Sequence, residues 1–301
     1  MMPRASRTTR RIGVALAVTA GGDAFVLDFH DGTTGTHDAY VQHYTPGSPA
    51  GTWTQELVLS KPNATSLGQT ASYLAVSDRG NAAAAFSTGG TAAYTAATRS
   101  GTTWTQPPQA SFSVNQIAVS VNDAGDVLIG YEDQGTVPHA YQYDATSMAW
   151  STTAATLNTE TEGSRNGSCP LTVKVASTGD ATLARCYSSS PQTLESYAFT
   201  KGTKTWAAAT AIPLTGYSFL GSFVFDSAGS GLAAFGDSAT NSTSTASVVT
   251  SSYETATGWS APSAPLGATP TGVPHAFISP NGRGWVARVD NQSTFKVEKV
   301  R

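Results

Sequence analysis

Carboxylates follow an aromatic residue at the same short distance in three places along the chain. The triplets are Phe29-His30-Asp31, Tyr131-Glu132-Asp133 and Phe235-Gly236-Asp237, and Asp290 stands near the same place after Val289. Carboxylates that converge from several segments can bind Ca²⁺, which takes about six to eight oxygen ligands, or a cationic or hydroxyl-rich ligand. The alternative is that each Asp only starts a turn by bonding its own backbone. The predicted ligand-binding residues are Asp31, Asp133, Asp237, Asp290 and Glu132. Ca²⁺ is the one cofactor that this pattern suggests.

The two cysteines, Cys169 and Cys186, lie at nearly equal distances on either side of the turn 177–180. Opposed Cα atoms of paired strands are about 4.5–5.5 Å apart, which is within disulfide reach. We therefore predict a disulfide, which would favour an oxidising compartment. The alternative is a pair of buried free thiols. With no Cys or His nearby, the spacing does not suggest zinc.

The sequence lacks several short motifs that are typical of enzymes. The sequence has no G-x-S-x-G elbow, no H-E-x-x-H and no phosphate-binding G-x-x-x-x-G-K-[ST] loop. No Arg recurs on the predicted inner strands, so an arginine triad of the sialidase type is not visible. Glu162 and Arg165 could act as an acid and a cation in the loop 155–168, or they form a solvated pair. Glycoside hydrolysis, which needs only two carboxylates at a set separation, stays open.

The elements that would position these residues come from a repeat. Alternating apolar residues, a short polar turn with Gly and a second apolar run recur six times, about 52 residues apart on average. A third apolar stretch and then a Trp follow the turn in five copies. Period-2 alternation with β-branched and aromatic residues predicts about four short strands in each copy. The turn glycines are Gly22, Gly80, Gly125, Gly179, Gly229 and Gly282, and the Trp residues are Trp53, Trp104, Trp150, Trp206 and Trp259.

Six copies of a four-stranded unit predict an all-β fold, a six-bladed β-propeller over residues 12–301. Small residues suit the crowded inner strands, as in Ala82 to Ala85. A stack of β-sandwiches is disfavoured, because a sandwich needs about 100 residues, twice this unit. The repeated segment resembles the propeller repeats of secreted bacterial proteins, including those with sialidase-type Asp-box turns. Asp78-Arg79-Gly80 and Asp123-Ala124-Gly125 keep the D-x-G of that box, although no copy holds it completely.

The two ends of the chain allow alternative interpretations. Residues 1–11 are basic, and with the apolar run that follows they could form a signal peptide over 1–20. The same apolar residues align with the first strand of the other copies, and that interpretation is favoured. The last copy ends after its third strand, which leaves three alternatives: the N-terminus closes the propeller, the last blade has three strands, or the chain is an incomplete gene product.

Charge and composition restrict the partners. Seventeen Lys and Arg face twenty Asp and Glu, and only 12 % of residues are charged. The absence of a basic surplus argues against nucleic acid, and no apolar run reaches the length of a membrane span. The chain also resembles six-bladed fucose lectins, which hold sugar in Trp and Arg/Glu pockets between blades. No Arg/Glu pair recurs with the Trp residues here, so these are predicted to be packing anchors.

These observations predict a non-catalytic binding or interaction module with a protein or glycan partner. We expect a monomer that is extracellular, at the cell surface or periplasmic. The alternatives are a carbohydrate-binding lectin and a glycoside hydrolase or sialidase-like enzyme.

Overall fold

The computed structural model of the chain describes twelve segments, and every regular element in them is a β-strand. They are residues 15–31, 36–62, 72–88, 93–108, 112–158, 171–187, 193–212, 217–238, 247–268, 274–279, 282–289 and 294–300. No helix in these segments is long and apolar enough to span a membrane. The chain divides into two compact units, residues 1–134 with 139–155 and residues 135–138 with 156–301. Each unit is described by itself.

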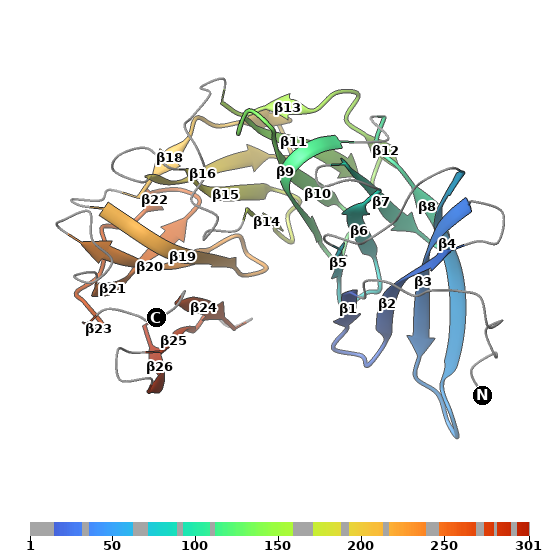
Figure 1. The fold of residues 1–301 in the computed structure, drawn as a ribbon, viewed down its shortest axis with the longest axis horizontal. Helices are drawn as coiled ribbons and strands as arrows, with labels where there is room; N and C mark the ends of the chain where they lie inside the picture. Colours follow the sequence, from blue (N-terminus) through green and yellow to red (C-terminus); the bar gives the residue numbers. More distant parts are fainter. Residues whose placement is uncertain are drawn as a thin grey trace. The chain divides into compact units, whose positions relative to one another are not determined.

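The first unit contains three antiparallel blades (Figure 1). Blades two and three are joined into one sheet by the pairs Ala93↔Ser113 and Tyr94↔Phe112. A short strand, β13 (Ala155–Thr156), lies at the end of this unit and pairs with β11. Blade one is β1 (Ala15–Val18), β2 (Ala24–Asp31), β3 (Thr36–Thr45) and β4 (Thr52–Pro62). Blade two is β5 (Ser72–Val76), β6 (Ala82–Ser87), β7 (Ala93–Ser100) and β8 (Thr103–Thr105). Blade three is β9 (Phe112–Val121), β10 (Val127–Asp133), β11 (Pro138–Asp144) and β12 (Ala149–Trp150).

The second unit contains two blades with short fourth strands and a sixth blade of three strands. Blade four is β14 (Thr172–Val175), β15 (Ala181–Tyr187), β16 (Thr193–Thr200) and β17 (Thr205–Trp206), with β18 (Thr210–Ala211) also on β16. Blade five is β19 (Tyr217–Phe225), β20 (Gly231–Ser238), β21 (Ser247–Glu254) and β22 (Gly258–Trp259), with β23 (Gly267–Ala268) also on β21. Blade six is β24 (His275–Ile278), β25 (Gly284–Val289) and β26 (Phe295–Lys299).

The described strands confirm the predicted fold class, a six-bladed β-propeller of four-stranded antiparallel blades with a three-stranded last blade. The five recurring Trp residues lie on fourth strands, as the repeat predicted, and the sixth, Trp285, lies on β25. Residues 15–18 form β1, which pairs with β2, so this part of the candidate signal peptide is a blade strand.

The hairpin between the first and second strands has the same geometry in all six blades. In blade three, the Asn122 N–H donates to the Asp126 carbonyl and the Gly125 N–H donates back to the Asn122 carbonyl. The glycine in this position has a φ of +91°, in the left-handed region that residues with a Cβ rarely adopt. The other five turn glycines have φ values from +76° to +88°. These glycines therefore give a fixed origin from which positions in different blades can be compared.

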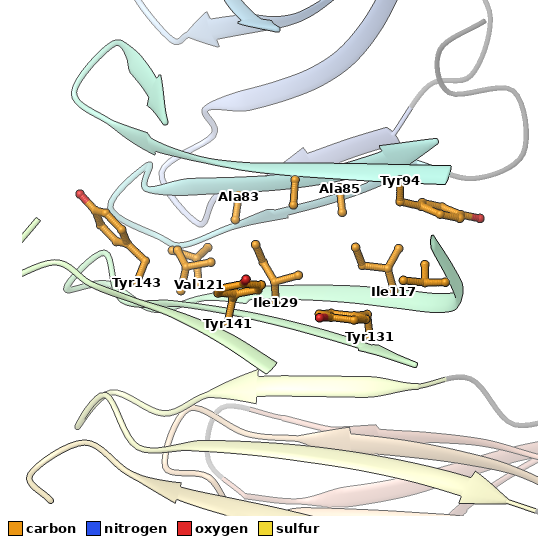
Figure 2. Packing of buried hydrophobic residues seen from close by; sticks show 12 residues of the cluster. Ala83, Ala85, Tyr94, Ile117, Val121, Ile129, Tyr131, Tyr141 and Tyr143 are labelled. Carbon is orange, nitrogen blue, oxygen red and sulfur yellow. The ribbon is translucent and has the colours of Figure 1, made fainter. Parts of the chain in front are cut away.

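Small side chains on the second strand allow neighbouring blades to pack closely. Ala82, Ala83, Ala84 and Ala85 are fully buried on β6. Figure 2 shows Ala83 and Ala85 facing Ile117 and Ile129 of blade three, with several tyrosines around them. Blades two and three therefore bury apolar faces against each other at the close packing typical of protein interiors.

Candidate functional site

The predicted carboxylates occupy two different positions once the blades are aligned on their turn glycines. Asp133 and Asp237 are both the eighth residue after the glycine, whereas Asp31 is the ninth. His30 takes the eighth position in blade one, and Asp31 pairs through its backbone with His37. Asp290 and the side chain of Asp31 lie outside the described residues. The end of each blade at which the second strand ends is called the strand-exit end below.

Four polar side chains meet at the strand-exit end of blade one, and we call Asp28, His30, Asp38 and Tyr40 the blade-one cluster. Asp28 lies opposite Tyr40, and His30 lies opposite Asp38. The His30 Nε2 is 2.9 Å from the Asp28 Oδ2. The Tyr40 hydroxyl donates to the Asp38 Oδ2 at 3.2 Å, and the Ser60 hydroxyl donates to Oδ1 at 2.6 Å. Side chains from three strands are thereby fixed in one place.

Burial differs within the blade-one cluster. The Asp28 side chain is 4 % exposed, whereas the His30 side chain is 20 % exposed. Burial, followed by the charge of Asp38 and the hydrogen bond to it, raises the pKa of Tyr40. Its hydroxyl therefore keeps its proton as a donor. The buried Asp28 carboxylate orients an imidazole that stays accessible, since a hydrogen bond on one ring nitrogen fixes the other.

Blade three has a second group at its strand-exit end, again with a His, an Asp and a Tyr. We call Tyr131, Asp133, His139 and Asn115 the blade-three cluster. The His139 Nε2 is 3.2 Å from the Asp133 Oδ2, and the Asn115 amide donates to the Asp133 carbonyl at 3.0 Å. The Tyr131 and His139 rings stack with centroids 5.0 Å apart. Burial, with smaller effects of Tyr141 and Asp133, raises the pKa of Tyr131 to about 12.

The two clusters share a His–carboxylate pair beside a tyrosine at the same end of their blades. In the blade-three cluster the His139 and Asp133 side chains are 17 % and 38 % exposed. Such a group offers donors, acceptors and an aromatic ring, which is the combination that binds hydroxyl-bearing ligands with an apolar face. Glu132, the neighbouring predicted ligand, is only 3 % exposed.

Asp237 sits in a different environment at the strand-exit end of blade five. It is half-buried on β20 between Ser218 and Ser247 of the neighbouring strands. Its Oδ1 is buried with no hydrogen-bond partner. Burial raises the pKa of this carboxyl, and a hydrogen bond from the Ser238 backbone only partly opposes the shift.

We expect Asp237→Asn to stabilise the protein at neutral pH. The folded state holds the Asp237 proton more tightly than the unfolded state, so ionisation of this carboxyl lowers stability as pH rises. The gain from the substitution should disappear as pH falls below 3.8, the ordinary value of the group. Thermal unfolding of both proteins across that pH range measures the difference. A gain that persists unchanged at low pH would contradict the assignment to this carboxyl.

The sequence prediction that no Arg recurs on the inner strands is wrong. Arg185 and Arg288 are both the sixth residue after their turn glycine, on β15 and β25. Arg185 is 1 % exposed, and its guanidinium donates to the Glu195 carboxylate at 2.7 Å and to the Thr136 carbonyl at 2.7 Å. Counting from the turn glycine would have revealed this recurrence.

Arg288 repeats the arrangement in blade six. Its guanidinium donates to the Leu266 carbonyl at 2.8 Å and to the Glu298 carboxylate at 3.0 Å. Each arginine therefore ties its second strand to the third strand and to a neighbouring carbonyl. Arg185 and Arg288 are therefore buried residues that hold neighbouring segments together, and they do not line an open pocket.

One Arg/Glu pair does accompany a Trp, between blades one and two. The Arg99 guanidinium binds the Glu56 carboxylate through two hydrogen bonds of 2.7 and 2.6 Å, and the Trp104 indole donates to the same carboxylate at 3.0 Å. Arg99 also donates to the Gly80 carbonyl and lies over the Phe25 ring. The Glu56 and Arg99 side chains are only 5 % and 13 % exposed. The Arg99–Glu56 pair therefore joins blades one and two, and neither charged group is open to solvent to any large extent.

Most of the other predicted residues lie outside the residues that the structure describes. Glu162, Arg165 and Cys169 lie outside it. Cys186 is 9 % exposed and is not a free thiol, but its predicted bridge to Cys169 stays a prediction. Within the described segments, no group of three or more His, Cys, Asp or Glu could hold a metal ion.

No protein-family profile and no curated protein matches this chain. Solved structures resemble it over most of its length. A protein of unknown function from Dyadobacter fermentans is 13 % identical over 97 % of this chain and 94 % of that one, with a TM-score of 0.48. The fucose-recognising lectin of Aleuria aurantia, a six-bladed β-propeller, is 13 % identical over 89 % and 81 %, with a TM-score of 0.40. A polysaccharide lyase described as an ulvan lyase is 10 % identical over 97 % and 87 %, with a TM-score of 0.47.

Proposed function

We propose that this chain is a non-catalytic binding module that takes a hydroxyl-rich ligand, a glycan, at the strand-exit ends of its blades. The observation that carries the proposal is the repeated His–carboxylate–tyrosine group of blades one and three. Both groups are held rigidly on strands rather than on loops. A site on strands needs little ordering when the ligand binds, so less of the interaction energy is lost to entropy.

The chemistry of the clusters fits sugar hydroxyls better than an ion. Each cluster pairs its carboxylate with an imidazole at 2.9 or 3.2 Å, so the negative charge is already shared with a donor. Neutral hydroxyls can donate to the carboxylate and accept from imidazole or phenol at the same time. The stacked Tyr131 and His139 rings add a flat surface for the apolar face of a sugar.

The test is a glycan array probed with the purified protein, followed by calorimetry with the glycan that binds best. We expect His30→Gln and His139→Gln each to weaken affinity by about tenfold, the effect of losing about 1.4 kcal/mol of hydrogen bonding. The bound oligosaccharide should be recovered unchanged by mass spectrometry. Cleavage of the oligosaccharide would favour the glycoside hydrolase alternative and contradict a non-catalytic module.

His43→Gln is the matched control. The His43 Nε2 lies 3.0 Å from the Asp23 Oδ1, so the pair has the same chemistry. It lies at the opposite end of blade one, because Asp23 follows the turn glycine. The control should keep its affinity while its melting temperature reports any general loss of stability. No bound glycan, or an equal loss of affinity in the control, would overturn the proposal.

We further propose that the module is extracellular, at the cell surface or periplasmic, and monomeric. A bridge between Cys169 and Cys186 would support this location, since disulfides persist in oxidising compartments. A Ca²⁺ site that includes Asp290 also remains a hypothesis, because its carboxylate lies outside the described residues.

A further inference from the structure

The outer hydrogen-bonding edge of β26, the last strand of blade six, has no partner strand among the described residues. In the part of the chain that the structure describes, β26 pairs only with β25. The Val300 N–H donates to the Gly284 carbonyl. Since inward and outward groups alternate along an antiparallel strand, Glu298 and Lys296 also face β25. The N–H and C=O groups of Phe295, Val297 and Lys299 therefore point outward.

The same strand exposes apolar side chains. Phe295 is 67 % exposed and Val297 is 57 % exposed. Among the described residues, neither side chain forms a hydrogen bond or a ring contact. An unpaired edge with exposed apolar residues is a template for the addition of another strand.

The other blades show what such a strand contains. In four of them a Trp on the fourth strand lies directly opposite an aromatic residue of the third strand, in pairs such as Tyr44↔Trp53 and Phe199↔Trp206. The ring centroids of the four pairs are 5.1 to 5.3 Å apart. The fourth strand is only two residues long in blades four and five. A short extended segment with one Trp is therefore sufficient to cover the outer edge of a third strand.

We propose that β26 binds an extended peptide segment of a partner protein, with a tryptophan as its anchor. The partner's backbone pairs with the outward groups of Phe295, Val297 and Lys299. The Trp packs at the Val300 end of the strand, because Val300 lies opposite Gly284 as Phe199 lies opposite Ala181. This interaction surface is separate from the strand-exit clusters and does not depend on glycan binding.

The probe is a synthetic peptide of residues 201–211, which carries Trp206 of blade four, with its ends blocked. We expect saturable binding to the full chain, and slower amide hydrogen exchange of Phe295, Val297 and Lys299 when the peptide is present. Replacing the Trp of the peptide with Ala should weaken binding by about tenfold, from the loss of buried apolar area.

Two variants locate the binding on the protein. Val297→Pro removes an outward N–H that the sheet does not use, so the fold should survive and the peptide should no longer bind. Val297→Thr keeps the N–H and should still bind. If the peptide still binds the Val297→Pro variant, it replaces the fourth strand of blade four instead of pairing with β26. That result would overturn the proposal. Protection of the three amides in the protein alone would also overturn it, since the edge would already be occupied.

Discussion

Replacing Glu195 with alanine should destabilise the protein by about 3–5 kcal/mol, the cost of leaving one member of a buried ion pair without its partner. The Arg185 and Glu195 side chains are 1 % and 4 % exposed and lie opposite each other on β15 and β16. The Tyr197 hydroxyl donates to the same carboxylate, and burial together with this hydrogen bond raises the pKa of Tyr197. Glu195→Ala therefore removes the acceptor of the buried Tyr197 hydroxyl and leaves the buried Arg185 cation without its carboxylate, although its hydrogen bond to the Thr136 carbonyl stays.

Urea unfolding at neutral pH measures this loss. The double variant Arg185→Met with Glu195→Leu should recover most of it, because apolar residues of similar volume can replace a buried pair at little cost. Glu298→Ala serves as the control, since the Glu298 side chain is 31 % exposed whereas that of Glu195 is 4 % exposed. That variant should cost about 1 kcal/mol or less. A loss for Glu195→Ala no larger than the control would show that the network contributes little.

Replacing Arg99 with alanine should cost about 3 kcal/mol. The substitution leaves the buried Glu56 carboxylate with the Trp104 indole donor and the His43 Nδ1 at 4.0 Å, and it removes the cation from the Phe25 ring. Arg99→Lys should fall between the two, because an ammonium keeps the charge but cannot form the paired hydrogen bonds of the guanidinium. Arg283→Ala, at an exposed turn position, should change stability by about 0.5 kcal/mol or less.

Thermal and urea unfolding compare these three variants. If Arg99→Lys is as stable as the wild type, the contribution of Arg99 comes from its charge and not from the paired hydrogen bonds of the guanidinium. If Arg99→Ala loses no more stability than Arg283→Ala, the Arg99–Glu56 pair does not stabilise the fold.

The fold was predictable because its signals are local and repeated. Each turn glycine adopts the left-handed conformation in a hairpin of fixed length, so the glycine spacing already counts the blades. Alternation then predicted the strands on either side of each turn. The same reasoning predicted that Ala82 to Ala85 form a strand, because the run is short and follows a turn.

The site was predictable only in part, because it depends on register and on contacts between blades. Asp133 was found from its aromatic neighbour, but His139 joins it from the next strand. The sequence pattern groups Asp31 with Asp133 and Asp237, although Asp31 lies one position further from its turn glycine. The equivalent residue in blade one is His30, so the pattern does not predict His30 or its partner Asp28. Glu56 and Arg99 are 43 residues apart and meet only because their blades stack. No local pattern in the sequence specifies that distance.

The pairing of β7 with β9 has a consequence for cooperativity. Two backbone pairs make blades two and three a single hydrogen-bonded sheet, and their facing sides share one buried cluster. Opening of either blade would expose an unpaired edge and half of that cluster in the other. Because backbone pairs and a shared core join them, these two blades should open and close as one folding unit, with a common free energy of local unfolding.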